Sequence, residues 1–385
     1  MENAVIVGAG KTGRGFIARL LQEAGIPFSL QDTDEALLQK IEKSNGFTIR
    51  FFSGRGPVAI PPVPLAASGS PAAQSALQKA AYIFVSVGAK NLPAAARQLG
   101  AALAGFGGKP RTIFLCENAV APAPEFRRIF REAGGPEDTG ICEAAVFCTT
   151  IETEPGAVNI ASEAFPHLIY STQGVAAPLP AAPQFAPEEN FPVLLKRKIY
   201  TYNASSAIIC YLGWALGLSS FGQSAHVPVV KKILDSFYQS INQAICREYG
   251  TSPKEQEAFS QMAWEKFSDL AIADTNQRNC AQPERKLAAT ERIAVPIRLL
   301  LKHRLPLAGM CLTAAAAIRY GEAYTENWKD LFPGMTAGET FARLAEIDSA
   351  PVCAAVQTAY DALLPPISEA NLEALYQTVG AQPAL

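Results

Sequence analysis

The stretch that decides the fold is Ala4-Val5-Ile6-Val7-Gly8-Ala9-Gly10-Lys11-Thr12-Gly13, near the start of the chain. Four apolar residues predict a short buried strand, and the G-x-G-x-x-G spacing after them predicts a tight turn into a helix. In this pattern Gly8 allows the turn, Gly10 lets the backbone approach a pyrophosphate, and Gly13 lets helix and strand pack closely. The phosphates would lie at the positive end of the helix. We expect Ala9, Lys11, Thr12 and Arg14 to belong to the same dinucleotide site.

Outward from this stretch, the first half of the chain alternates short β-rich runs with amphipathic stretches. Strands are expected near residues 4–7, 28–31, 81–87 and 112–115, each followed by a helical pattern. Such alternation predicts parallel β-α-β units and a Rossmann-type, doubly wound sheet. A Pro- and Ala-rich stretch at 176–192 predicts a linker or domain boundary, and helical patterns follow it. We therefore expect an α/β protein with a dinucleotide-binding domain at 1–190 and an all-α substrate domain at 191–385.

An acidic residue at the end of the second expected strand indicates which dinucleotide binds. Asp32 lies 24 residues after Gly8, where a carboxylate accepts hydrogen bonds from an adenosine ribose. Its charge would repel a 2′-phosphate, so NAD is expected rather than NADP. Asp34 could take the same role, and either residue could instead cap the following helix.

Composition limits the class of partner. The 385 residues are 49% hydrophobic and 18% charged with a net charge of -2, so neither nucleic acid nor a membrane surface is expected. The apolar stretch at 204–222 contains four serines and three glycines, which predicts a buried helix rather than a membrane span. Eight scattered cysteines and three histidines lack zinc spacing, which predicts reduced thiols, a cytoplasmic protein and no metal. The expected partner is a small molecule, bound by a monomer or a small homo-oligomer.

Two polar segments of the second half are candidates for substrate chemistry. In the run from Arg197 to Ser206, helical spacing would place Lys198, Asn203 and Ser206 within an arc of about 140°. A desolvated lysine there could remove a proton from an alcohol, and the asparagine could orient the substrate oxygen. The alternative is a solvated lysine beside a capping asparagine. The second segment, 278–287, carries Arg278, Arg285 and Lys286, which could bind a phosphate or polyhydroxyl group or form a solvated basic loop.

Four motifs together resemble one enzyme family. They are Gly8 to Phe16, Cys116-Glu117-Asn118, Arg197-Lys198 to Asn203, and Pro283-x-Arg285-Lys286-Leu287, in an order and at spacings similar to those of the mannitol-1-phosphate 5-dehydrogenase family. The resemblance covers nearly the whole chain and places it among the polyol-specific long-chain dehydrogenases. It implies that Lys198 is the general base and that Asn203 polarises the substrate oxygen. It also implies that Arg278 and Lys286 line the substrate pocket, and that Val87, Gly88 and Asn118 meet the cofactor.

The sequence departs from this family at two places that bear on the substrate. Ser206 stands where the family has a histidine, and Val146-Phe147-Cys148 replaces a Val-Asp-Arg run. We expect an NAD-dependent dehydrogenase of a polyol, a polyol phosphate or a related sugar acid, with Ser206 supplying a second hydrogen bond. The alternative from these departures is a non-catalytic NAD(H)-binding sensor or regulatory protein.

Overall fold

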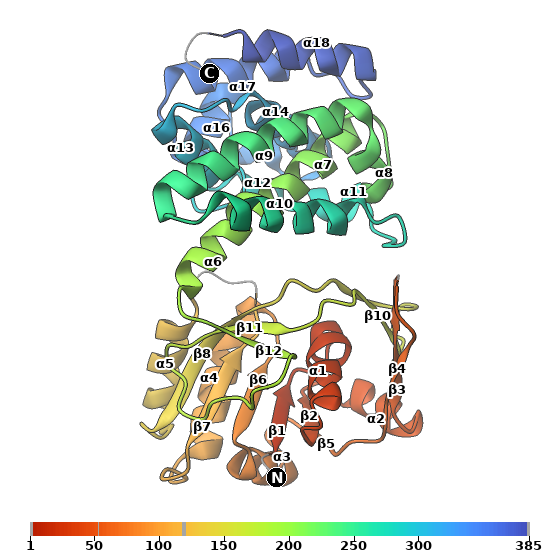
Figure 1. Ribbon diagram of the computed structural model, residues 1–385, viewed down its shortest axis with the longest axis vertical. Helices are drawn as coiled ribbons and strands as arrows, with labels where there is room; N and C mark the ends of the chain where they lie inside the picture. Colours follow the sequence, from red (N-terminus) through yellow and green to blue (C-terminus); the bar gives the residue numbers. More distant parts are fainter. Residues whose placement is uncertain (1–2, 53, 118–120, 383–385) are drawn as a thin grey trace. The chain divides into compact units, whose positions relative to one another are not determined.

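The computed structural model describes residues 3–52, 54–117 and 121–382, and the chain forms two compact units, Met1–Phe191 and Pro192–Leu385. The first unit contains an eight-stranded sheet (Figure 1). All neighbouring strands are parallel except β8 and β11. In spatial order the strands are β12 (Phe185–Glu188), β11 (Leu168–Ser171), β8 (Thr139–Ala145), β7 (Arg111–Leu115), β6 (Tyr82–Val85), β1 (Ala4–Val7), β2 (Phe28–Asp32) and β5 (Leu65–Ala67).

Both faces of this sheet are covered, because successive side chains of a strand point to opposite sides. Ala4 and Ile6 of β1 pack into one hydrophobic cluster, and Val5 and Val7 pack into another. The first cluster includes α1 (Ala18–Glu23) and α2 (Glu35–Lys43), and the second includes α3 (Pro71–Lys79), α4 (Leu92–Leu103) and α5 (Ala123–Glu132). The predicted doubly wound sheet is therefore confirmed.

Two features of this unit were not predicted from the sequence. Residues 176–192, expected to be a linker or domain boundary, contain the edge strand β12, which pairs in parallel with β11, and the two units divide after Phe191. A second, four-stranded sheet was not expected at all. It has the order β4 (Val58–Ile60), β3 (Phe47–Phe51), β10 (Ile160–Ser162) and β9 (Thr150–Glu152). Apart from β3, which has five residues, these strands have only three or four, and such short strands leave too little alternation to be recognised in a sequence.

The second unit is built from helices, as predicted. Every residue of α7 except Trp214 is buried, and α7 packs against α8, α9, α11 and α14. This explains why the apolar stretch from 204 is so hydrophobic. The helices are α6 (Phe191–Lys198), which begins in the first unit, α7 (Ala204–Ala215), α8 (Phe221–His226), α9 (Pro228–Tyr249), α10 (Pro253–Ser268), α11 (Asn276–Cys280), α12 (Pro283–Leu287), α13 (Ala294–His303), α14 (Ala308–Tyr324), α15 (Trp328–Leu331), α16 (Ala337–Ala345), α17 (Ala350–Ala362) and α18 (Glu369–Gly380).

Several of these helices begin at capping residues that are typical of helix starts. Ser252 and Ser368 accept hydrogen bonds from backbone N–H groups at the starts of α10 and α18, and Thr336 and Glu339 form a reciprocal capping box on α16. Among the helices formed by described residues, none combines the length and apolar character needed to cross a bilayer.

Candidate active site

The glycine-rich turn follows β1 and opens a helical segment whose first turn is a π-helix, η1 (Gly13–Ile17). Gly8 has a φ of +104°, and a Cβ there would lie 2.1 Å from the carbonyl oxygen of Ser86. A Cβ on Gly13 would lie 2.0 Å from the carbonyl oxygen of Gly8. A Cβ on Gly10, in contrast, would meet nothing within 4 Å. Gly8 and Gly13 are thus required by the fold, whereas Gly10 leaves open space at the start of the helix, where a dinucleotide phosphate would fit.

Asp32 and Asp34 have different tasks beside this turn. Asp32 ends β2, and its Oδ2 accepts a hydrogen bond from the backbone N–H of Ala9 at 2.6 Å. Its Oδ1 accepts from the backbone N–H of Asp34 at 2.9 Å. Asp34 caps α2 by accepting from the N–H of Leu37 at 3.0 Å. Asp32 therefore holds the glycine turn while each of its oxygens retains acceptor capacity for a ribose hydroxyl.

The remaining predicted residues of the turn differ in exposure. Ala9 is buried, Lys11 is exposed and Thr12 is half-buried. Arg14 is fully buried, and burial lowers the pKa of its guanidinium group. That group donates to the carbonyl oxygens of Ala157 at 3.1 Å and Val158 at 2.6 Å. Arg14 therefore fixes the small sheet to η1, and its contacts do not support the cofactor role that the sequence suggested.

Residues that follow the neighbouring strands β6 and β7 also lie at this edge of the sheet. Gly88, after β6, has a φ of +86°, and its backbone N–H donates to Oε1 of Glu117 at 2.6 Å. Val87 lies against the glycine turn, since its Cγ1 would be 3.2 Å from a Cβ on Gly8. Burial raises the pKa of the Glu117 carboxyl group. Asn118 lies outside the described residues.

Glu117 is a site residue that the sequence analysis did not single out by itself. Its position directly after Cys116, in a run that follows β7, was the available signal, because parallel strands end at the same edge of a sheet. The structure thus brings the glycine turn, Asp32, Val87, Gly88 and Glu117 together along the adjacent strands β2, β1, β6 and β7.

In the second unit, Lys198 ends α6 and leads into a π-helical turn, η3 (Ile199–Asn203). The backbone N–H of Ala204 donates to the carbonyl oxygen of Ile199, five residues earlier. Ordinary helical geometry puts Lys198 and Asn203 about 140° apart. A π-turn, with its i to i+5 bonds, instead brings residues five apart to neighbouring positions. The structure therefore places these two residues closer together than the sequence analysis expected.

The environment of Lys198 favours its neutral form. The side chain is half-buried, and its pKa is lowered to about 7, first by desolvation and then by the positive charges of Lys266 and Arg292. Asn203 is half-buried and Ser206 is buried. A lysine of this kind can accept a proton near neutral pH, as a general base must.

Lys286, which was predicted to bind the substrate, lies near the same charged residue, Arg292, as Lys198 does. It is buried, and its ammonium group donates to the carbonyl oxygens of Asn279 and Ala281. Desolvation is the main cause that lowers its pKa to about 8, and the charge of Arg292 contributes. Arg292 therefore acts on both lysines. Neither Lys266, within α10, nor Arg292, in the turn before α13, was identified from the sequence, because they belong to no recognised motif.

The other two basic residues of this segment are engaged elsewhere. Arg278 is exposed and pairs with Asp274, with Nε 2.6 Å from Oδ1. Arg285 is exposed and donates to Gln282 at 3.0 Å and to Glu291 at 2.7 Å. Their side chains are held by these partners, so the structure does not bring them to Lys198.

The replaced Val-Asp-Arg run also has a structural explanation. Phe147 and Cys148 are buried in the first unit. Phe147 stacks on Phe165 at 5.6 Å between ring centroids, and the sulfur of Cys148 lies 3.2 Å from the hydroxyl of Ser162. These residues pack the interior of the first unit.

Both parts of the chain are similar to known proteins. Residues 193–349 match the family described as mannitol dehydrogenase C-terminal domain, and residues 4–167 match ketopantoate reductase PanE/ApbA. A mannitol-1-phosphate 5-dehydrogenase of Paenarthrobacter aurescens (strain TC1) is 25% identical over 348 residues, covering 85% of this chain and 89% of the relative.

Two solved structures have the same fold along nearly the whole chain. A D-sorbitol dehydrogenase in substrate-free form has a TM-score of 0.75 at 13% identity, covering 97% of this chain and 94% of the other. The mannitol 2-dehydrogenase of Pseudomonas fluorescens, in a ternary complex with NAD and D-mannitol, has a TM-score of 0.73 at 14% identity, with 98% and 94% covered. These two structures share the fold of the chain, and the helical unit, through residues 193–349, matches the mannitol dehydrogenase C-terminal domain.

Proposed function

We propose that this protein is an NAD-dependent dehydrogenase that interconverts a secondary alcohol and a ketone on a polyol, a polyol phosphate or a related sugar acid. The observation that carries the proposal is Lys198, a half-buried lysine with a pKa of about 7, in a unit that matches the mannitol dehydrogenase C-terminal domain. The match of the helical unit and the similarity to a mannitol-1-phosphate 5-dehydrogenase support the oxidoreductase class. The non-catalytic alternative has no observation in its favour, since a regulatory module has no need of a lysine that is neutral near pH 7.

In the proposed reaction, neutral Lys198 takes the proton of the substrate hydroxyl group. Asn203 donates a hydrogen bond to the same oxygen and stabilises the negative charge that develops on it, and the Ser206 hydroxyl supplies a second hydrogen bond. Bound NAD would supply the hydride acceptor for the carbinol carbon. In the reverse direction protonated Lys198 returns the proton to the oxygen of the ketone.

The first unit fits the cofactor. The open space at Gly10 and the N–H groups at the start of the helical segment suit a pyrophosphate, and Asp32 suits the adenosine ribose. We assign Gly8, Gly10, Gly13, Asp32, Val87 and Gly88 to this site, with Glu117 as the residue that positions Gly88.

The charges around Lys198 support a narrower proposal for the substrate. Lys266 and Arg292 both act on Lys198, and Arg292 also acts on Lys286. Positive charges gathered in this way favour a substrate that carries a phosphate or a carboxylate, because the anionic group offsets their mutual repulsion. We therefore rank polyol phosphates and sugar acids above uncharged polyols.

A cytoplasmic location remains part of the proposal. All eight cysteines are free thiols, as is usual for proteins in a reducing compartment. Small molecules are the proposed ligands, and the oligomeric state, monomer or small homo-oligomer, remains a prediction.

The decisive experiment compares the wild type with Lys198→Ala and with a matched control, Lys196→Ala, in which an exposed lysine two residues earlier is removed. Polyols, polyol phosphates and sugar acids are screened with NAD and NADH by absorbance at the nicotinamide band. We expect turnover by the wild type and the control, loss of at least about 10²-fold in Lys198→Ala, and unchanged NADH binding in all three. Turnover by Lys198→Ala at the rate of the control would refute the assignment of the base.

A further inference from the structure

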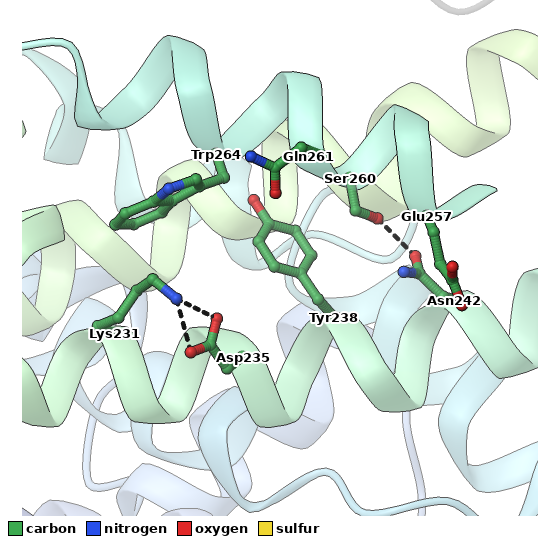
Figure 2. Close-up of a pocket in the computed structure, with 8 residues that line it drawn as sticks. All are labelled: Lys231, Asp235, Tyr238, Asn242, Glu257, Ser260, Gln261 and Trp264. Carbon is green, nitrogen blue, oxygen red and sulfur yellow. Dashed lines mark hydrogen bonds and ion pairs between the residues drawn. The ribbon is translucent and has the colours of Figure 1, made fainter. Parts of the chain in front are cut away.

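A polar cavity lies between α9 and α10, within the second unit (Figure 2). Its volume is about 290 Å³, at the lower end of the range of pockets that hold small ligands, roughly 300–1,000 Å³. Buried Tyr238 and Ser260 and half-buried Asn242 line its interior, and the exposed side chains of Asp235 and Glu257 stand at its edge. Trp264 forms one wall.

Tyr238 leaves a polar atom in this cavity without a partner. The residue is 8% exposed, and its buried hydroxyl lies close to the Ser205 hydroxyl without meeting it, or any other described residue, in hydrogen-bond geometry. The Ser205 hydroxyl donates its proton to the carbonyl oxygen of Thr201 at 2.6 Å. A buried hydroxyl without a well-formed hydrogen bond is destabilising, so a ligand that hydrogen-bonds to it would be favoured.

Asn242 presents donors to the same space. Its Oδ1 accepts hydrogen bonds from Gln256 Nε2 at 3.0 Å and from the Ser260 hydroxyl at 2.6 Å. These two bonds fix the amide, so its NH₂ group is directed into the cavity between Tyr238 and Glu257 (Figure 2). No described residue accepts from this NH₂ group. The cavity thus offers hydroxyl and amide donors beside carboxylate acceptors.

The charges of the lining residues exclude anions. Lys231 is neutralised by Asp235, whose carboxylate oxygens lie 2.5 and 2.6 Å from the ammonium group. The same ammonium group lies 4.6 Å from the centroid of the Trp264 ring. Glu257 makes no ion pair with a described residue, so the lining keeps a net negative charge that repels phosphates and carboxylates.

The cavity is distinct from the surroundings of Lys198. Lys266, whose charge acts on Lys198, is nine residues after Glu257 on α10. At about 100° per residue these two positions lie on opposite sides of the helix. The cavity residues Glu257, Gln261 and Trp264, at spacings of four and three, share one side of α10.

From these observations we infer that the cavity between α9 and α10 is a second binding site for a small uncharged polyhydroxylated molecule. Hydroxyl groups both donate and accept, so they match the Tyr238 hydroxyl, the Asn242 amide and the Glu257 carboxylate at once. This site would repel anions, whereas the substrate proposed to bind beside Lys198 carries a phosphate or a carboxylate. A bound polyol would tie α9 to α10 and would not need to occupy the site of catalysis.

Trp264 provides the test, since it is one of three tryptophans and lines the cavity. Sorbitol, mannitol and glycerol are titrated through the millimolar range while tryptophan fluorescence is recorded, with mannitol 1-phosphate and methylamine as charged comparisons. We expect a saturable change with the uncharged polyols that disappears in Trp264→Phe. Tyr238→Phe should bind about tenfold more weakly, and Lys198→Ala should bind as the wild type does.

Several outcomes would overturn the inference. They are the lack of a saturable Trp264-dependent change, equal affinity in Tyr238→Phe, and preferred binding of the phosphate or the amine. If Tyr238→Phe does not fold, Ser260→Ala takes its place, because it frees the Asn242 amide to rotate, and unchanged affinity there would count equally against the site. Activity plays no part in this readout, so failure of the proposed enzymatic function leaves the result interpretable.

Discussion

Lys198 combines a titratable amine with surroundings that keep it neutral near pH 7. Desolvation, Lys266 and Arg292 all disfavour the ammonium form, and each lowers the pKa. A base must be unprotonated to act, so alcohol oxidation requires the form that predominates above pH 7. We expect kcat/KM for oxidation to rise about tenfold per pH unit below about pH 7 and to level off above it. Initial rates between about pH 5.5 and 9 check this, and a profile without a rise would exclude Lys198 as the base.

Arg292 offers a control for the same experiment. Its charge opposes protonation of Lys198, so Arg292→Gln should raise the pKa of Lys198 and move the rise in kcat/KM to higher pH. A purely structural role of Arg292 would lower the rate without moving the profile.

We propose that the charge of Asp32 selects NAD over NADP. Its carboxylate would lie beside the 2′-position of the adenosine ribose, where NADP carries a phosphate. We expect NADH to bind at least about tenfold more tightly than NADPH, a difference of about 1.4 kcal/mol, and Asp32→Asn to narrow this gap. Asp34→Asn is the matched control, since asparagine also caps helices well. Calorimetric titration measures all three proteins, and equal affinities in the wild type would contradict the assignment.

At the scale of an element, the six-residue turn from β1 into η1 contains glycines with different tasks. Some are required by the fold, and one is expected to serve cofactor binding. A Cβ on Gly13 would overlap the carbonyl oxygen of Gly8, whereas a Cβ on Gly10 would meet only open space. Gly13→Ala should therefore destabilise the first unit by more than about 1 kcal/mol. Gly10→Ala should fold like the wild type and bind NADH at least about tenfold more weakly. Thermal unfolding and NADH titration of the two variants, side by side, distinguish these effects.

Sequence patterns predicted the features that depend on a recognised motif or on residues close together in the chain. The glycine spacing and the capping residues of α10, α16 and α18 follow short-range patterns, and Asp32 follows from its distance to the glycine turn within the β-α-β motif. The surroundings of Lys198 could not be predicted, since Lys266 of α10 and Arg292 of the turn before α13 reach it only through tertiary packing. The π-turn η3 was also missed, because spacing rules assume a regular α-helix. For Arg14, a motif position suggested a role that its buried contacts do not support.

At the scale of the whole molecule, each unit has its own core, and the three tryptophans report on only one of them. Trp214, Trp264 and Trp328 all belong to the second unit. NAD⁺ at about a hundred times its dissociation constant should stabilise the first unit by about 2.7 kcal/mol. We expect the circular dichroism melt to shift upward while the tryptophan transition stays in place. If both transitions shift together, the two units unfold as one.

The half-buried amine of Lys198 has a further consequence, in the chemistry of labelling. With a pKa of about 7, a substantial fraction of the Lys198 side chains is unprotonated at neutral pH, against fewer than about one in a thousand for an ordinary lysine. Acylating reagents and aldehydes attack only that form. A limiting dose of a small amine-reactive reagent at neutral pH should therefore mark Lys198 ahead of the exposed lysines, and mass spectrometry of the digested protein would locate the mark on one peptide.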